Sequence, residues 1–299
     1  MSKSQQRCGF VAIIGRPNVG KSTLLNQLLG QKISIVAPKA QTTRHKIVGI
    51  KTADDYQLIF LDTPGLHRGG GRQLNTVMNK AALSVLSDAD VILFVIEWQR
   101  FTDADQWILE RLKQTQVPII LVMNKIDTCA KKDELLPKIA GFQAENFTAI
   151  VPYSARRQQY RDQLIETVVA QCPVSEHFYY EAHQVTDRSP SFLVAERLRE
   201  QLVLQLGDEL PYATTVSIEH YAAAAKRVDI HALIWVEREG QKAIVIGQKG
   251  QRLKRIASEA RAEIEAMLGK QVVMQVWVKV KSDWSDDPNS LKQFGFDVS

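Results

Sequence analysis

The chain has 299 residues, of which 45% are hydrophobic and 24% are charged, and its formal net charge is +5 at pH 7. This length is sufficient for two domains with separate cores, and no apolar run approaches the ~18 residues that a membrane-spanning helix needs. The N-terminal stretch "MSKSQQRCGF" lacks the apolar segment of a signal peptide, so we expect a cytoplasmic protein. The cysteines, Cys8, Cys129 and Cys172, form no CxxC pair, which argues against a disulfide framework and a zinc site.

Apolar runs of strand length alternate with helical repeats through the first half of the chain, at 10–15, 56–62, 90–97, 117–124 and 147–154. These runs are apolar on both faces, which is typical of parallel strands covered by helices on each side. The run "HKIVGIKT" at 45–52 is separated from the next run by a short Asp54–Asp55 turn, so we expect an antiparallel hairpin at the sheet edge. The first half therefore predicts a doubly wound, mostly parallel α/β domain.

The first motif is "GRPNVGKS", which matches the phosphate-loop pattern G-x-x-x-x-G-K-[ST]. It follows a buried strand and opens a helical repeat, where backbone N–H groups and the helix N-terminus can surround phosphate oxygens. Lys21 is expected to reach the outer phosphates and Ser22 to ligate Mg²⁺. The predicted loop residues are Gly15, Arg16, Pro17, Asn18, Val19, Gly20, Lys21 and Ser22.

A second motif, "DTPG", ends the run at 56–62. Asp62 is placed like the aspartate that holds Mg²⁺ in phosphate-loop enzymes, and Gly65 can donate its N–H to a γ-phosphate. "KAQTTRHK" carries Thr42 and Thr43, of which we expect Thr43 to cover the metal ion. "LHRGGGR" supplies glycines that allow the segment to reorganise when the γ-phosphate is lost. The nucleotide contacts predicted here are Asp62, Thr63, Pro64, Gly65 and Leu66, and the metal ligands are Ser22, Thr43 and Asp62.

A third motif, "NKID", lies at the end of the run at 117–124, and we expect it to recognise the base of a bound nucleotide. Asp127 therefore lies at a carboxyl end of the sheet, where such folds bind ligands. Its carboxylate can accept hydrogen bonds from the N1–H and the 2-amino group of guanine, and adenine does not offer that arrangement. An acceptor left unpaired costs ~1 to 3 kcal/mol, so GTP is favoured over ATP. The predicted contacts are Asn124, Lys125, Ile126 and Asp127.

The second half begins after a helix at 161–171 and a stretch at 174–191 that loses periodicity and predicts a linker. An amphipathic helix, "SFLVAERLREQLVLQLG", is followed by the strands "ATTVSIEHY" and "VDIHALIWVER". We then expect a turn at "EREGQK", a strand at "KAIVIG", a helix ending at Gly269 and the strand "VVMQVWVKV". This order predicts an α+β domain.

"VIGQKGQRLKRI" contains a GxxG loop placed, in this reading, between a strand and a helix, as in KH domains that clamp single-stranded nucleotides. GxxG alone is a weak signal, but the segment 238–281 carries ten Lys and Arg against four Asp and Glu. Such a basic surface favours a polyanion, although a solvated helix face remains the alternative for any single cation. The predicted RNA contacts are Gly247, Gln248, Lys249, Gly250, Arg252, Lys254 and Arg255.

Together these motifs resemble those of the Era family of GTPases. The stretches that carry the resemblance are "GRPNVGKSTLLN", "KAQTTRHKIVGI", "DTPGLH", "NKID", "TDRSPSF", "ELPY", "VEREGQK", "VIGQKG" and "VWVKVK". The resemblance covers nearly the whole chain. It implies a GTP-hydrolysing domain with GTP or GDP and Mg²⁺, joined to a type II KH domain. It also implies binding to 16S rRNA near its 3′ end, a role in 16S rRNA processing and 30S subunit biogenesis, and peripheral contact with the cytoplasmic face of the inner membrane. We expect a monomer.

On this plan we expect a GTPase domain, a linker with a connecting helix, a KH domain and a C-terminal tail, at 7–174, 175–205, 206–285 and 286–299. After "PYSA", where the family continues with a glycine-containing turn, this chain has "RRQQYRDQ". Ser154 and Ala155 still suit a loop that contacts guanine.

Leu66 follows "DTPG", and a leucine cannot orient a water by hydrogen bonding, so intrinsic hydrolysis should be slow. Asn18 resembles the asparagine that lets related GTPases bind K⁺, whose charge acts where an arginine finger would; the alternative is a side chain that only shapes the loop. The residues expected to act in hydrolysis are Lys21, Thr43, Gly65 and Asn18.

Two other functions remain open from sequence. One is an RNA-binding protein whose nucleotide site is only structural. The other is a membrane-associated signalling GTPase in which the KH domain only recruits.

Overall fold

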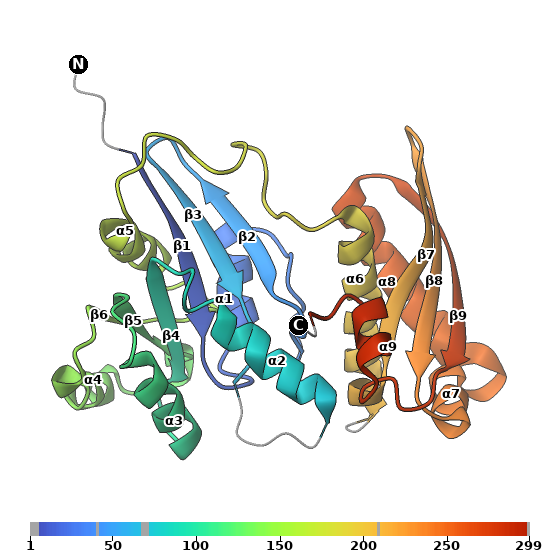
Figure 1. The fold of residues 1–299 in the computed structure, drawn as a ribbon, viewed down its shortest axis with the longest axis horizontal. Helices are drawn as coiled ribbons and strands as arrows, with labels where there is room; N and C mark the ends of the chain where they lie inside the picture. The colour runs from blue at the N-terminus through green and yellow to red at the C-terminus, as the bar shows by residue number, and fades with distance from the viewer. Residues whose placement is uncertain (1–5, 40–41, 67–71, 208–209, 298–299) are drawn as a thin grey trace. The chain divides into compact units, whose positions relative to one another are not determined.

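The structure is a computed structural model that describes residues 6–39, 42–66, 72–207 and 210–297. The chain forms two compact units, each built on its own sheet (Figure 1). The N-terminal unit holds the described residues up to Ser34, with 43–66 and 78–187. The C-terminal unit holds residues 188–297 that are described, together with 35–39, 42 and 72–77 from the first half of the chain.

The N-terminal unit contains a six-stranded sheet in the order β2-β3-β1-β4-β5-β6. Its strands are β1 (Arg7–Ile14), β2 (Ile47–Thr52), β3 (Tyr56–Asp62), β4 (Val91–Glu97), β5 (Ile119–Asn124) and β6 (Ala149–Pro152). β2 and β3 pair antiparallel, and the other neighbouring strands pair parallel. The predicted mostly parallel sheet with an antiparallel edge hairpin is therefore confirmed.

Helices cover both faces of this sheet (Figure 1). They are α1 (Lys21–Leu29), α2 (Gln73–Ser84), α3 (Asp103–Leu112), α4 (Leu135–Ala140) and α5 (Arg161–Gln171). One core packs Ala82 of α2 and Ile108 of α3 against Ile14 and Phe94, and all four are fully buried. α1 and α5 pack against β1 and against each other. Alternate residues of each strand therefore meet different helices, which explains why the strands are apolar on both faces.

The stretch from 174 to 187, expected to be a linker, forms no helix or strand but is anchored to the N-terminal unit. The N–H of Ile50 donates to the carbonyl of Val185 at 2.7 Å, and the Thr186 hydroxyl donates to the carbonyl of Val48 at 2.6 Å. Tyr180 packs against the core and donates its N–H to the Gln57 side chain. Lack of periodicity therefore marks an irregular segment here, held by backbone hydrogen bonds.

The C-terminal unit has a three-stranded sheet in the order β7-β8-β9, with β7 and β8 antiparallel and β8 and β9 parallel. Its strands are β7 (Thr215–Ala223), β8 (Arg227–Val236) and β9 (Gln271–Val280), and its helices are α6 (Pro190–Gln205), α7 (Glu239–Ile246), α8 (Gln251–Leu268) and α9 (Pro288–Gln293). Leu198 of α6 and Ile256 of α8 pack on Ile230 of β8 in its core. The order α6-β7-β8-α7-α8-β9 confirms the α+β class expected for a KH domain, and it differs from the predicted order at α7.

The expectation of a strand at "KAIVIG" is wrong, because α7 covers it. The side-chain oxygen of Gln241 accepts the N–H groups of Glu237 and Arg238, which starts the helix, and Gly247 ends it at φ 70°. Both neighbours of β8 in the sheet are already taken by β7 and β9. β-Branched residues therefore adopt a helix here because caps and sheet topology outweigh their strand propensity. No helix among the described residues is long and apolar enough to cross a membrane.

Candidate nucleotide site and candidate nucleic-acid interface

The phosphate loop joins β1 to α1, and its lysine lies inside it. The Lys21 ammonium is buried and donates to the carbonyls of Gly15 and Arg16, both at 3.0 Å. Burial lowers the pKa of Lys21 to about 8, although Asp62 attracts its charge. A phosphate anion beside this amine would favour its protonated form, so the loop is suited to an anionic ligand.

The three predicted metal ligands lie together. The Ser22 and Thr43 hydroxyl oxygens are 2.7 Å apart, and Asp62 Oδ2 accepts from Ser34 Oγ at 2.9 Å and from Thr43 Oγ1 at 3.4 Å. Asp62 is fully buried, burial raises its pKa, and its Oδ1 has no hydrogen-bond partner. An orphaned carboxylate oxygen beside two hydroxyls fits a hard cation such as Mg²⁺. Ser34 was missed from sequence, because "KISIVAP" carries no motif.

Asn124 at the end of β5 ties the phosphate loop to the loop after β6. Its Nδ2 donates to the Val19 carbonyl at 2.8 Å, and its Oδ1 accepts the Ala155 N–H at 3.0 Å. The Asp127 carboxylate accepts from Ser154 Oγ at 2.7 Å. The structure thus brings the "NKID" and "SA" residues to one edge of the sheet, as the base-reading hypothesis requires.

The loop after Ser154 keeps its closed form without the family's glycine. Ser154 pairs with Gln159, and the Ser154 hydroxyl accepts the Arg157 N–H at 3.1 Å. Gln158 and Tyr160 adopt positive φ angles of 55° and 64°. These two residues take the left-handed conformations that a glycine would adopt more readily.

The "DTPG" turn packs directly on the phosphate loop. A Cβ atom at Gly65 would lie 2.7 Å from the Pro17 nitrogen, so only glycine fits there. The Thr63 hydroxyl donates to the Ile13 carbonyl at 3.0 Å, and the Leu66 N–H donates to Gly15 at 3.3 Å. Leu66 is buried in the core, in keeping with the expectation that its side chain does not handle water. The glycine run at 69–71 and residues 40–41 lie outside the described residues.

Arg16 and Lys125, predicted as nucleotide contacts, both pair with Glu97 at the end of β4. Arg16 also reaches Asp105, which is buried at the start of α3. Sequence reasoning named neither acid. The signal available for Glu97 was its place at the carboxyl end of a strand, in a sheet whose other strands carry motifs at the same end.

The GxxG loop lies between α7 and α8, not between a strand and a helix as expected. Gly247, Lys249 and Gly250 have φ angles of 70°, 49° and 76°. A Cβ at Gly247 would lie 2.6 Å from that of Arg252, whereas one at Gly250 would meet nothing within 4 Å. Gly247 is therefore required by packing and Gly250 by backbone conformation, which leaves the loop open at Gly250.

The basic residues beside this loop fall into two groups. Arg252 donates to the Ile244 carbonyl at 2.7 Å, at the end of α7, and Arg255 pairs with Glu259 at 2.9 Å. The side chains of Lys249 and Lys254 form no hydrogen bond or ion pair within the part of the chain that the structure describes. These two lysines are the cations best placed for phosphate groups.

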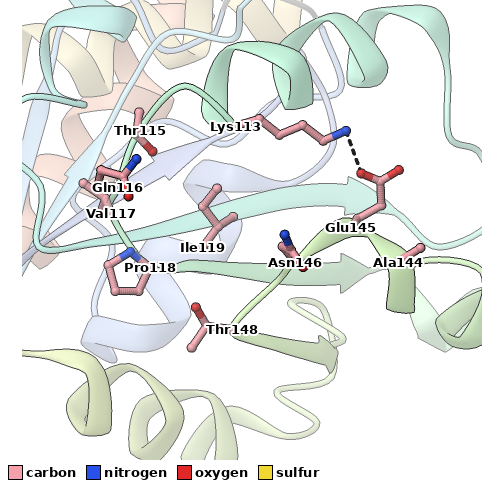
Figure 2. A pocket seen from close by; sticks show the side chains of 10 residues that line it. All are labelled: Lys113, Thr115, Gln116, Val117, Pro118, Ile119, Ala144, Glu145, Asn146 and Thr148. Atoms are coloured by element: carbon pink, nitrogen blue, oxygen red, sulfur yellow. Dashed lines mark ion pairs between the residues drawn. The ribbon is translucent and has the colours of Figure 1, made fainter.

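A cavity of about 680 Å³ lies at the start of β5 in the N-terminal unit. Figure 2 shows the side chains that line it. The Lys113–Glu145 ion pair, at 2.8 Å, contributes both of its side chains to the lining. No predicted site residue lines this cavity. The nucleotide site is thus not this hollow, and it lies where the motifs meet, at the opposite ends of the strands.

The comparisons with known proteins include matches to both domains of the chain. Residues 10–125 match the family model described as a 50S ribosome-binding GTPase, and residues 209–285 match the KH domain model. The GTPase Era of Pseudomonas syringae pv. tomato is 48% identical over 291 residues, 97% of each chain. That of Ectopseudomonas mendocina is 50% identical over 292 residues, also 97% of each chain.

Two solved structures are similar over almost the full length. One is a crystal structure of Era in complex with MgGDPNP and nucleotides 1506–1542 of 16S ribosomal RNA, and the other is an Aquifex aeolicus Era variant bound to GDP·AlF₄⁻. Each is 38% identical, with a TM-score of 0.93, over 97% of this chain and 99% of the other. The chain therefore belongs to the Era family of GTPases, with a GTP-hydrolysing domain followed by a KH domain.

Proposed function

We propose that this chain binds Mg²⁺ and GTP at the phosphate loop, hydrolyses GTP, and binds 16S rRNA near its 3′ end through its KH domain. It would act in the cytoplasm, in 16S rRNA processing and 30S subunit biogenesis. The observation that carries the first part is the orphaned Asp62 oxygen beside Ser22 and Thr43. A relative solved with MgGDPNP and a 16S rRNA fragment supports the rest.

The chemistry follows from the residues around that oxygen. Mg²⁺, when bound, neutralises charge on the phosphate oxygens. Lys21 and the N–H groups at the start of α1 hold the phosphates, and Gly65 offers its N–H to the γ-phosphate. Because Leu66 is buried, no side chain at that position orients the attacking water, and we expect slow intrinsic turnover.

Asn18 supports a role for K⁺. It is exposed in the phosphate loop at φ 66°, and within the described residues its side chain has no hydrogen-bond partner. Its amide oxygen is thus available to a monovalent cation beside the phosphates. Replacing K⁺ by Na⁺ should slow wild-type hydrolysis more than it slows Asn18→Ala; equal rates in the two salts would leave Asn18 as a loop-shaping residue.

We further propose that nucleotide state is passed to the KH domain by the segments near 38–45 and 62–72. Two described residues in or just before the first segment contact α6 within the C-terminal unit: Glu200 accepts the Val36 N–H at 3.1 Å, and Arg199 donates to the Thr42 carbonyl at 2.5 Å. Arg199 is itself fixed by two 2.7 Å hydrogen bonds to Glu196. Thr43, the next residue along the chain, touches Ser22 in the metal site.

The start of α2 is held in the same unit. The Leu74 N–H donates to the Ser285 carbonyl at 3.0 Å, and the Gln73 N–H donates to Asp286 at 2.8 Å. Residues just before Thr43 and residues after the "DTPG" motif therefore belong to the C-terminal unit, which supports a link between hydrolysis and RNA release.

The test measures phosphate release from GTP over many turnovers, and affinity for a 16S 3′-end RNA with GDPNP or GDP bound. We expect turnover and a nucleotide-dependent affinity. Absence of turnover would favour a structural nucleotide site. Crosslinking in cells then separates ribosomal RNA from lipid; lipid in excess would favour the signalling alternative. Cell fractionation tests the proposed peripheral contact with the inner membrane, and sedimentation tests the proposed monomer.

A further inference from the structure

Glu97 bridges the two ends of the candidate nucleotide site. One carboxylate oxygen, Oε2, accepts from the Arg16 guanidinium at 2.8 Å, and the other, Oε1, pairs with the Lys125 ammonium. Arg16 belongs to the phosphate loop and Lys125 to the base-reading motif. A single side chain therefore joins the segments that would meet the two ends of a bound nucleotide.

Arg16 is held from a second side by α3. Its Nε donates to Asp105 Oδ2 at 3.0 Å, and the same oxygen accepts the N–H and the hydroxyl of Thr102, which caps the helix. Asp105 is fully buried. The guanidinium thus has a fixed position, and Glu97 transfers that position to Lys125.

Two further observations concern the stability of this bridge. Partial burial acts to raise the pKa of Glu97, but the hydrogen bonds from Lys125 and Arg16 outweigh it, so the pKa lies below its usual value. Lys125 adopts φ 66°, a left-handed conformation that side chains seldom take without compensating contacts. The ion pair with Glu97 is such a contact.

We propose that Glu97 is a positioning residue of the nucleotide site, which holds the phosphate loop and the base-reading motif at the spacing that guanine nucleotides require. Asn124 makes the corresponding neutral link, from Val19 to Ala155. Glu97 makes an ionic link through side chains. The inference rests on the proposed nucleotide site.

The chain offers a matched control in Glu145. It pairs with Lys113 at 2.8 Å, and its side chain is 29% exposed against 23% for Glu97. It lines the cavity in Figure 2, at the start of β5, whereas Lys125 follows the end of that strand. Glu145→Gln therefore removes the same charge from the same unit without touching the site.

The experiment compares Glu97→Gln and Glu145→Gln in the full chain. For Glu97→Gln we expect Mg–GDPNP and GDP to bind about tenfold more weakly, the effect of losing a charged hydrogen bond. The weaker binding should appear as a higher KM for GTP. The kcat at saturating GTP should stay close to that of the wild type, because bound nucleotide restores the spacing between the phosphate loop and the base-reading motif. Glu145→Gln should bind both nucleotides as the wild type does, and the two nucleotide-free variants should melt at similar temperatures.

Glu97→Asp keeps the charge but is too short to span both cations, so we expect an intermediate affinity. It also replaces Glu97→Gln in the comparison if that variant fails to fold. Wild-type affinity in Glu97→Gln, or a lower melting temperature with unchanged affinity, would overturn the positioning role. An equal loss in Glu145→Gln would overturn it too. Failure of the wild type to bind GDPNP would instead remove the nucleotide site itself.

Discussion

The candidate nucleotide site and the GxxG loop both address phosphate, but they are built in opposite ways. In the N-terminal unit Lys21, Asp62 and Asn124 are buried, and each is held by hydrogen bonds: Lys21 and Asn124 donate to carbonyls of the phosphate loop, and Asp62 accepts from two hydroxyl groups. In the C-terminal unit the loop is open at Gly250, and the Lys249 side chain forms no hydrogen bond or ion pair among the described residues. A compact ligand that must be positioned for chemistry needs a preorganised site, whereas a long polyanion needs access and a few unpaired cations.

The largest effect should come from the buried cation. Lys21→Ala removes the ammonium inside the phosphate loop, and we expect GTP turnover to fall on the order of 100-fold. Affinity for 16S 3′-end RNA in the absence of nucleotide should remain, because the residue lies in the other unit. Phosphate release and RNA binding are measured on the same preparation, with Lys113→Ala at the cavity of Figure 2 as the control. Turnover at the wild-type rate would remove Lys21 from the phosphate-binding role.

A change at the base-reading end should be smaller but more specific. In Asp127→Asn the amide oxygen can still accept from Ser154, so the loop geometry is kept while the second acceptor is lost. GTP affinity should fall by roughly 10- to 100-fold, and XTP should gain relative to GTP. Competition binding with both nucleotides measures this, with Asp103→Asn as an exposed control. An unchanged preference for GTP over XTP contradicts the assignment.

In the open loop, Gly250→Asp places a side chain on a backbone with φ 76° and adds negative charge where RNA phosphates are expected. We expect RNA affinity to fall about tenfold or more, while GTP binding survives. Gly240→Asp in α7 carries the same charge at an exposed site where nothing lies within 4 Å of its Cβ. If both variants bind RNA as the wild type does, "GQKG" is only a turn.

Loss of a single lysine from the loop should weaken RNA binding less than Gly250→Asp does. Lys249→Ala should weaken RNA binding a few-fold and reduce the slope of log affinity against log salt by about 0.7, the value for one contact on a single strand. Arg255→Ala should change the slope less, because Arg255 is already paired with Glu259. Titrations at several salt concentrations compare the two. Equal slope changes would mean that pairing within α8 does not decide which cations meet RNA.

The smallest expected effect is the uptake of less than one proton when nucleotide binds. Lys21 titrates at about 8 when buried, below its ordinary value of 10.5, so between these values the unfolded chain binds a proton that the folded chain lacks. The free energy of unfolding without nucleotide should therefore rise with pH across this window. A bound phosphate raises the pKa of Lys21 again. GDPNP binding at a pH about one unit above 8 should therefore take up part of a proton, and the affinity for GDPNP should fall as the pH rises further.

Calorimetric titration in two buffers of different ionisation enthalpy measures that uptake. Lys21→Arg, which stays protonated, should show none. If the wild type takes up no proton on binding, the buried ammonium is not beside the phosphates.

Much of the fold, and the meeting of the candidate nucleotide-site motifs at one edge of the sheet, were predictable from the amino-acid sequence. The strands from 10 to 154, the edge hairpin at 45–62 and the meeting of Ser22, Thr43 and Asp62 followed from local signals. A phosphate loop needs its glycines and lysine at fixed spacing, and parallel strands carry their motifs to one edge. The constraint lies within a few residues of chain, so it can be read there.

Tertiary structure alone decided the rest, because it depends on partners far apart in the chain. "KAIVIG" is a helix since Gln241 caps it and β9 already occupies the free side of β8. Arg252 and Arg255 are engaged by Ile244 and Glu259, which separates them from Lys249 and Lys254. Glu97 gained its two cations only when β4 was placed beside the phosphate loop and β5, through hydrogen bonds between strands that no local pattern encodes.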